Sequence, residues 1–265
     1  MVVDGRTIAN DIYGALKKRV ALCEEKPRLG ILTYAPNFET EKYLNLKERK
    51  AREVGIETIR VTLEDVVTTE IVLSKLAELA RVTDGVVVQL PLPSHVDTDA
   101  VLSALPHSHD VDALNPQTTT VLPPVVGAIV EILKKYEVGV FEKHVVVVGS
   151  GKLVGRPAAA WFIKQGASVS VVTKDTNDVA YYTKNADIIV LGAGSPRMLT
   201  PDMVKDGVVI LDAGTSEDGG VLTGDADPEC AKKASLFTPV PGGIGPITIA
   251  VLLRNVIELT DAIND

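Results

Sequence analysis

Cysteine is scarce in this sequence, and its few copies lie far apart. Cys23 and Cys230 are the only two, and they show no spacing typical of zinc ligands. The four histidines form no metal-ligand pattern either. The sequence therefore predicts neither a disulfide-stabilised scaffold nor a metal site, and we expect a reducing compartment.

Basic residues are also in deficit. The chain has 27 lysines and arginines against 35 aspartates and glutamates, a formal net charge of -8 at pH 7. This balance argues against nucleic acid as a partner, so any bound anion must be held locally. No run approaches the ~20 apolar residues of a membrane span, and the N-terminus has no signal-peptide pattern. We therefore expect a soluble, cytoplasmic protein that binds no membrane.

Aromatic residues make up only 4% of the chain, whereas hydrophobic residues as a whole reach 46%. The core must therefore consist of Val, Ile, Leu and Ala, a composition typical of parallel strands covered by helices. A length of 265 residues allows one large core or two modest ones.

Helices and strands alternate through the first part of the chain. Apolar residues recur every fourth position from Ile8 to Val20, which predicts a helix. The pattern of apolar and turn-forming residues then predicts a strand over 29–33, a helix over 39–54, a strand over 56–63, a helix over 69–80 and a strand over 85–89. The natural assembly of these elements is a parallel α/β unit.

Prolines cluster around residues 106–124, where the periodicity is lost, and they indicate a domain junction. Beyond it we expect helices over 126–136 and 157–165 and strands over 145–148, 168–172, 188–191 and 208–211. These elements predict a doubly wound, Rossmann-type sheet. The predicted fold is thus a two-domain α/β protein. Its domains span 1–117 and 118–245, and a C-terminal helix within 246–265 returns to the first domain.

A glycine-rich loop follows the valine strand and opens the next helix. In this context Gly149 and Gly151, on either side of Ser150, would allow a tight turn and a close approach to a pyrophosphate. Gly155 would let the helix pack closely on the sheet. An ordinary strand-to-helix turn is the alternative, and the flanking strand and helix favour a dinucleotide.

The following strand ends where dinucleotide folds discriminate between NAD and NADP. Asp175 would bind the ribose 2′-hydroxyl of NAD, whereas Thr173 and Lys174 would receive the 2′-phosphate of NADP. A solvated lysine is the third alternative. A second loop over 192–196, containing Gly194, either borders the nicotinamide or is a plain turn.

Four polar residues of the first domain are candidates for chemistry. Tyr43 and Lys47 stand four apart on a predicted helix and share a face, although an exposed lysine in a charged run is the default. Gln89 ends a buried strand, at the edge where open α/β sheets bind ligands. Asp112 lies in an irregular loop, where carboxylates are also ordinary turn residues.

Several segments along the chain are distinctive in type and order. They are Asp4-Gly5, the YxxxK motif of Tyr43 and Lys47, the DGxxVQLPLP motif over 84–93, Asp110-Val111-Asp112, Val154-Gly155-Arg156-Pro157 and the PVPGGIGPIT segment over 239–248. Together these segments resemble the family of bifunctional 5,10-methylenetetrahydrofolate dehydrogenase/5,10-methenyltetrahydrofolate cyclohydrolases. The resemblance spans essentially the whole chain, and the QLPLP and PVPGGxGP motifs are its most specific parts.

The resemblance implies that folate lies in a cleft between the two domains. Lys47 would be the central acid/base group, and Gln89 would hold its amine and help to keep it neutral. Tyr43 would orient the pteridine and aminobenzoyl region, and Asp112 would hydrogen-bond the pteridine ring. The wall against which pterin and nicotinamide meet would be formed by Pro241, Gly242 and Gly243.

The implied reaction oxidises 5,10-methylenetetrahydrofolate and then hydrolyses the methenyl product to 10-formyltetrahydrofolate, in a homodimer. The chain departs from the family pattern around the cofactor, where Ser150 and Thr215 replace the usual residues. We favour NADP because Lys174 is present and the family generally uses it, and Asp175 keeps NAD as the alternative. The implied cofactor contacts are Gly149, Ser150, Gly151, Gly155, Thr173, Lys174, Gly194 and Thr215.

Three other functions share some of these features. A monofunctional NAD-dependent methylenetetrahydrofolate dehydrogenase is disfavoured because both Lys47 and Gln89 are present. A non-catalytic folate- or nucleotide-binding protein would have lost Tyr43, Lys47 or Asp112, and all are present. A shikimate-dehydrogenase-like oxidoreductase would share the glycine loop, but it would not explain QLPLP or PVPGGIGPIT.

Overall fold

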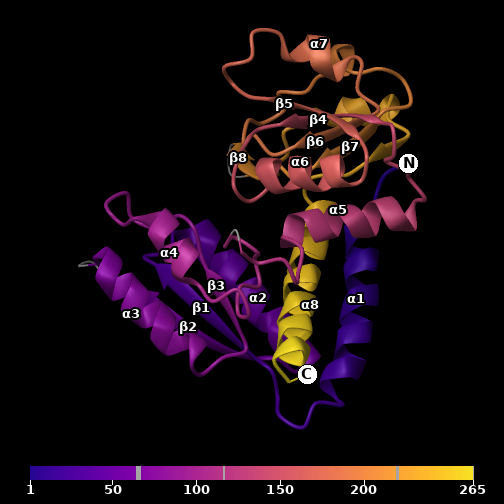
Figure 1. The fold of residues 1–265 in the computed structure, drawn as a ribbon. Helices are drawn as coiled ribbons and strands as arrows, with labels where there is room; N and C mark the ends of the chain where they lie inside the picture. The colour runs from indigo at the N-terminus through magenta and orange to yellow at the C-terminus, as the bar shows by residue number, and fades with distance from the viewer. Residues whose placement is uncertain (64–66, 116, 219–220, 265) are drawn as a thin grey trace. The chain divides into compact units, whose positions relative to one another are not determined.

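The structure, a computed structural model, describes residues 1–63, 67–115, 117–218 and 221–264. The chain divides into unit 1, Met1–Ala9 with Val125–Thr248, and unit 2, Asn10–Pro124 with the chain from Ile249 onward (Figure 1). Each division point lies in or at the end of a helix, namely α1 (Gly5–Val20), α5 (Pro124–Lys135) and α8 (Ile244–Asn264). The functional ranges expected from the sequence, 1–117 and 118–245, stay a prediction.

Unit 2 is built on a parallel sheet with the strand order β2-β1-β3. Its strands are β1 (Arg28–Tyr34), β2 (Glu57–Leu63) and β3 (Gly85–Val88). The helices between and after them are α2 (Phe38–Val54), α3 (Thr69–Ala80) and α4 (Thr98–Ala104). Residues of α3 and α4 pack with Leu32, Val86 and Val88 on one face of this sheet.

The opposite face of the unit 2 sheet carries the alternate residues of the same strands. A Cβ added to Gly85 of β3 would lie 3.6 Å from a side-chain atom of Val256, which places α8 against this face. Asn255 of α8, 1% exposed, donates to the carbonyls of Val111 and Leu122, both at 2.8 Å. The C-terminal helix therefore packs on the first α/β unit, as predicted.

Local signals fix both ends of α2. The side chain of Asn37 accepts the N–H of Thr40 at 2.8 Å and caps the first turn. Gly55 ends the helix in the left-handed region with φ of 93°, where its N–H bonds to the last carbonyls. The position of α2 matters because this helix carries Tyr43 and Lys47.

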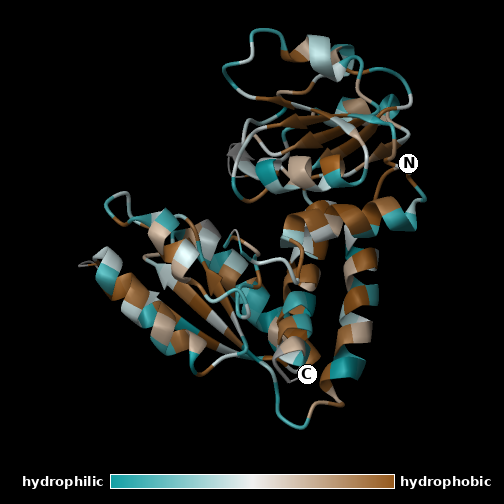
Figure 2. Ribbon diagram, viewed as in Figure 1, coloured by the Kyte–Doolittle hydropathy of each residue, from teal (hydrophilic) through white to brown (hydrophobic). Residues whose placement is uncertain are grey.

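Unit 1 contains a five-stranded parallel sheet with the order β10-β7-β6-β4-β5. Its strands are β4 (His144–Val148), β5 (Ser168–Val172), β6 (Ile188–Leu191), β7 (Val209–Asp212) and β10 (Leu236–Phe237). The remaining elements are α6 (Gly155–Lys164), α7 (Val179–Thr183), the hairpin of β8 (Ser216–Asp218) and β9 (Val221–Thr223), and the short helices η1 (Pro201–Met203) and η2 (Pro228–Lys232). Hydrophobic residues concentrate in the strands, as Figure 2 shows.

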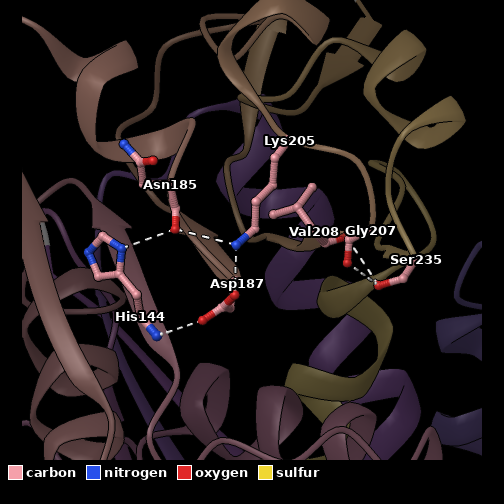
Figure 3. A network of polar contacts seen from close by, with 7 residues as sticks. All are labelled: His144, Asn185, Asp187, Lys205, Gly207, Val208 and Ser235. Carbon is pink, nitrogen blue, oxygen red and sulfur yellow. Dashed lines mark hydrogen bonds and ion pairs between the residues drawn. The ribbon is translucent and has the colours of Figure 1, made fainter.

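The same pair of hydrogen bonds, made by an aspartate just before a strand, occurs at the amino edge of each of the two sheets. Asp84, just before β3, accepts the N–H of Arg28 at 2.7 Å and donates its own N–H to the Arg28 carbonyl. Asp187, just before β6, makes the same exchange with His144, whose N–H lies 2.9 Å from the Asp187 carboxylate (Figure 3). Each aspartate thus adds a side-chain bond that supports the register between its own strand and the neighbouring strand.

The predicted two-domain α/β fold with parallel sheets is confirmed, as are the main helices and strands, within a few residues at their ends. The last helix is longer than predicted and begins at Ile244. The elements that the sequence analysis missed are the short ones: α4, α7, β8, β9, β10, η1 and η2. Each of them contains too few residues to show the hydrophobic periodicity of a helix or a strand.

Candidate functional site

Lys47 is buried, contrary to the default expectation for a lysine in a charged run. Its side chain is 4% exposed, and its Nζ donates to Oε1 of Gln89 at 3.1 Å. Gln89 in turn donates its amide nitrogen to the carbonyl of Leu90 at 3.0 Å, which fixes the carbonyl end of the side chain toward the lysine. The structure therefore presents one oriented amine at the carboxyl end of β3.

Tyr43 lies one helical turn before Lys47 and faces the same amine. The Nζ atom lies 4.8 Å from the centroid of the half-buried tyrosine ring. Burial raises the pKa of the Tyr43 hydroxyl, and the negative charge of Asp112 adds to that shift. The phenol therefore stays neutral and presents a flat ring and a hydroxyl.

Asp112 completes this group. Val86 donates its N–H to the carbonyl of His109 at 2.6 Å, which holds the following Asp110-Val111-Asp112 segment beside β3. Burial raises the pKa of Asp112 to about 6, Lys47 opposes that shift and Asp110 adds to it. The sequence-predicted set of Tyr43, Lys47, Gln89 and Asp112 is thus brought together in unit 2.

The electrostatics of this group favour a neutral amine. Burial lowers the pKa of Lys47, because the low-dielectric surroundings disfavour its charged form, and Asp112 opposes that shift. A neutral amine has a lone pair, and the bond to Gln89 leaves it available to accept a proton. The arrangement can therefore serve general acid–base chemistry.

Thr33 is a neighbour of this group that the sequence analysis missed. It is 1% exposed, and its Oγ1 has no hydrogen-bond partner among the residues that the structure describes. Leu32 pairs with Val88, so the next residues, Thr33 and Gln89, share the face of the sheet that α2 covers. A threonine inside a strand is too common to signal a site, and only its burial without a partner marks it.

In unit 1, the glycine loop has the geometry expected of a phosphate-binding turn. Gly149 has φ of 101°, and a Cβ on Gly155 would lie 2.1 Å from the Gly149 carbonyl oxygen. A Cβ on Gly151, by contrast, would meet nothing within 4 Å, so the loop is open at this residue. Arg156 ties the loop to α6 by donating its Nε to the Ser150 carbonyl at 2.9 Å. These residues fit a bound dinucleotide phosphate.

The turn after β5 exposes the two residues that could distinguish NAD from NADP. Thr173 and Thr176 close it, because the N–H of Thr173 donates to the Thr176 hydroxyl at 3.0 Å. Lys174 and Asp175 lie exposed at its tip. Both therefore remain able to meet a ribose substituent.

The remaining predicted contacts also lie in unit 1. The amide of Gly194 is bonded internally to Asp225 at 3.1 Å, and Thr215 is exposed after β7. Gly243 donates to the Pro239 carbonyl at 2.7 Å, and Gly242 accepts the N–H of Gly5 at 2.9 Å. The Asp4-Gly5 and PVPGG motifs, at opposite ends of the sequence, thus pack together.

A separate cavity of about 810 Å³ lies at the amino edge of the unit 2 sheet. Its lining includes Arg28 and Asp84, at the opposite edge from Gln89. Its charged residues largely satisfy one another, as in the ion pair of Arg19 with Asp261. This cavity is therefore not the candidate site.

The part of the chain that the structure describes contains neither a metal-binding cluster nor a membrane-spanning helix. Among residues 1–63, 67–115, 117–218 and 221–264, no cluster of three or more His, Cys, Asp or Glu is placed to hold a metal ion. No helix in the same part of the chain is long and apolar enough to cross a membrane.

Comparison with known proteins relates both units to one family. The model of the tetrahydrofolate dehydrogenase/cyclohydrolase catalytic domain matches residues 3–112, and that of the family's NAD(P)-binding domain matches residues 123–264. The bifunctional protein FolD of Nautilia profundicola is 35% identical over 97% of this chain and 96% of that protein.

Two solved structures are similar over their whole length. The bifunctional FolD methylenetetrahydrofolate dehydrogenase/cyclohydrolase from Campylobacter jejuni is 32% identical with a TM-score of 0.95, covering 99% of each chain. The Trypanosoma brucei enzyme, solved with NADP cofactor and inhibitor, is 31% identical with a TM-score of 0.94, covering 100% of this chain and 98% of that chain.

We expect Asp112→Asn to lower the pKa of Lys47 further, because the substitution removes the negative charge that opposes the effect of burial. The Lys47 amine of the variant then becomes neutral at a lower pH than in the wild-type protein. NMR titration with lysine labelled with carbon-13 at Cε measures this, and Lys50 of the same helix is the internal control. A Lys47 titration that stays in place or moves to higher pH would contradict the coupling.

Thr33→Val should raise the free energy of unfolding by about 1 kcal/mol, because it removes a buried hydroxyl that has no protein partner. Urea denaturation followed by circular dichroism measures the change. Thr62→Val is the matched control, since Thr62 is the register partner of Thr33 on β2 and is exposed. A less stable Thr33→Val protein would mean that the hydroxyl makes a favourable bond.

Proposed function

The chain belongs to the tetrahydrofolate dehydrogenase/cyclohydrolase family, and on that premise we propose that it performs both reactions in one-carbon metabolism. It oxidises 5,10-methylenetetrahydrofolate to the 5,10-methenyl form with NADP, and it hydrolyses that product to 10-formyltetrahydrofolate. The observation that carries this proposal is the buried amine of Lys47, held by Gln89 at 3.1 Å.

Unit 2 supplies the groups that bind and orient the folate. The ring of Tyr43 offers a flat surface for the pterin and aminobenzoyl region. Asp112 accepts hydrogen bonds from the pterin ring when its carboxyl is ionised, above its pKa of about 6. The roles of Pro241, Gly242 and Gly243 in unit 1 as a wall for the ligands stay a prediction.

Lys47 moves protons in the hydrolysis. Water adds to the methenyl carbon, and the neutral amine accepts a proton from it. The lysine then returns the proton to the ring nitrogen that leaves as the carbon–nitrogen bond breaks, and the hydroxyl proton of the adduct passes to solvent. Gln89 holds the amine in place and thereby leaves its lone pair directed at the water.

Unit 1 holds the dinucleotide. The loop from Gly149 to Gly155 lies at the N-terminus of α6, where backbone amides and the helix dipole favour phosphate. When bound, NADP accepts the hydride that leaves the methylene carbon of the folate. The protein's contribution to that step is to orient the folate and to exclude water.

NAD is the second candidate cofactor, because the exposed Asp175 stands beside Lys174 at the ribose-discriminating turn. We favour NADP for two reasons: Lys174 supplies a cation for the 2′-phosphate, and the similar Trypanosoma brucei enzyme was solved with NADP. The homodimer and the cytoplasmic location stay predictions.

Lys47→Met should reduce the rate of methenyltetrahydrofolate hydrolysis about 100-fold or more, because it removes the proton acceptor. The fold should remain, since methionine suits a buried, largely apolar position. Spectroscopic loss of the methenyl form measures the rate, and Lys50→Met on the same helix is the control. Normal hydrolysis by Lys47→Met would contradict the assignment of the lysine.

Lys174→Ala should raise KM for NADP about tenfold and leave KM for NAD unchanged, because it removes one charge-assisted bond to the 2′-phosphate. The substitution is at an exposed position, so stability should not change. Reduction of each cofactor by methylenetetrahydrofolate measures the effect, with Lys164→Ala at the C-terminal end of α6 as the control. Equal changes in both KM values would exclude recognition of the 2′-phosphate by Lys174.

A further inference from the structure

Asp225 is a buried carboxylate for which the proposed function has no role so far. It is 0% exposed and lies in the chain between β9 and η2. Its side chain accepts the N–H groups of three consecutive residues, Ala193 at 2.7 Å, Gly194 at 3.1 Å and Ser195 at 2.8 Å. These residues belong to the loop that follows β6, at the carboxyl edge of the sheet.

Three amides that converge on one carboxylate fix the loop in a single conformation. The bonds are charge-assisted, and they are partly buried because the accepting carboxylate is enclosed while the loop itself is exposed. They also occupy the N–H groups that the loop could have offered to an anion. The groups that the loop still offers to a ligand are its carbonyls and the exposed side chain of Ser195.

The backbone at Asp225 is itself held in place by a second carboxylate, that of Asp212. Asp212, at the end of β7, accepts the N–H of Asp225 at 3.2 Å and that of Ala226 at 2.8 Å. Asp212 also donates its own N–H to the hydroxyl of Thr238 at 2.6 Å. A continuous set of hydrogen bonds thus links the residues that follow β6, β7 and β10.

Two glycines leave the space that these carboxylates occupy. A Cβ on Gly214 would lie 2.3 Å from Cγ of Asp225, and one on Gly224 would lie 2.2 Å from Oδ2 of Asp212. Any larger residue at either position would displace a carboxylate. The local sequence therefore accommodates this arrangement specifically.

The loop held by Asp225 supports the glycine loop. A Cβ on Gly149 would lie 2.5 Å from the carbonyl oxygen of Gly192, the residue before Ala193. A Cβ on Gly192 would lie 2.5 Å from a side-chain atom of Val154, at the start of α6. Displacing residues 193–195 would therefore shift the surface on which the phosphate-binding turn rests.

We propose that Asp225 is a positioning residue for dinucleotide binding: it holds the loop over 193–195 so that Gly192 supports the turn at Gly149. The inference rests on the proposed function, because it takes the glycine loop as the cofactor site. Asp225 acts through the backbone of unit 1, whereas the proton chemistry of hydrolysis depends on residues of unit 2.

Asp225→Asn tests the proposal in the full-length protein. An asparagine keeps the size of the side chain but has one acceptor oxygen, and its NH₂ group would face a backbone N–H. KM for NADP should rise about tenfold, within the range that misplacing a binding loop costs. The rate of methenyltetrahydrofolate hydrolysis, measured without cofactor, should stay at the wild-type value.

Asp187→Asn is the matched control. Asp187 lies in the same unit, at the opposite edge of the same sheet, and its carboxylate accepts a backbone N–H from His144 and a bond from Lys205 at 2.7 Å (Figure 3). This variant should lose stability, yet keep KM for NADP unchanged. Trp161 is the only tryptophan and lies in α6, so its fluorescence reports the folded state of unit 1 in each variant.

The outcomes separate this inference from the proposed function. Wild-type protein that reduces neither cofactor would contradict the proposed function. A folded Asp225→Asn protein with an unchanged KM for NADP, or with both activities reduced by the same factor, would overturn only the role of Asp225. If Trp161 shows that Asp225→Asn does not fold, Asp225→Glu keeps the charge and displaces the carboxylate by one methylene. A normal KM in that variant would also overturn the proposal.

Discussion

The candidate chemistry depends on one interaction, the hydrogen bond between the buried amine of Lys47 and the side-chain carbonyl of Gln89. Burial lowers the pKa of the Lys47 amine but does not orient it, and the bond to Gln89 gives it a direction. The carboxylate of Asp112 limits how far the pKa falls, so the amine can both accept and return a proton. Helix α2, with its caps at Asn37 and Gly55, and strand β3 bring the two partners together.

The carboxyl edges of the two sheets present different kinds of groups to a ligand. In unit 2 the carboxyl edge of the sheet presents side chains, and their charges are tuned by burial. In unit 1 the corresponding edge presents backbone, and its loops are shaped by internal hydrogen bonds to Asp225 and Asp212. Chemistry that moves protons needs titratable groups, whereas binding of a dinucleotide needs a rigid turn.

Sequence patterns predicted the long elements because each repeats a period over several turns or residues. They also placed Gln89 at a ligand-binding edge and Lys47 on the helix face that carries Tyr43. The default for the lysine was an exposed position, because its burial depends on tertiary packing that no local pattern encodes. Thr33 and Asp225 could not be predicted. Thr33 is identified only by the lack of a partner, and Asp225 is separated by about thirty residues from the loop whose amides it accepts.

The aspartates that precede β3 and β6 have a consequence for engineering. Because the strand ladders carry the register, supported at the amino edges by Asp84 and Asp187, the loops at the carboxyl edges need not do so. A change in a loop at the carboxyl edge therefore need not shift the strands, whereas the conformation of the loop over 193–195 still depends on Asp225. Each sheet should therefore accept a ligand-binding loop from a related chain, provided that its aspartate at the amino edge is kept and that, in unit 1, the loop over 193–195 is exchanged together with its partner Asp225.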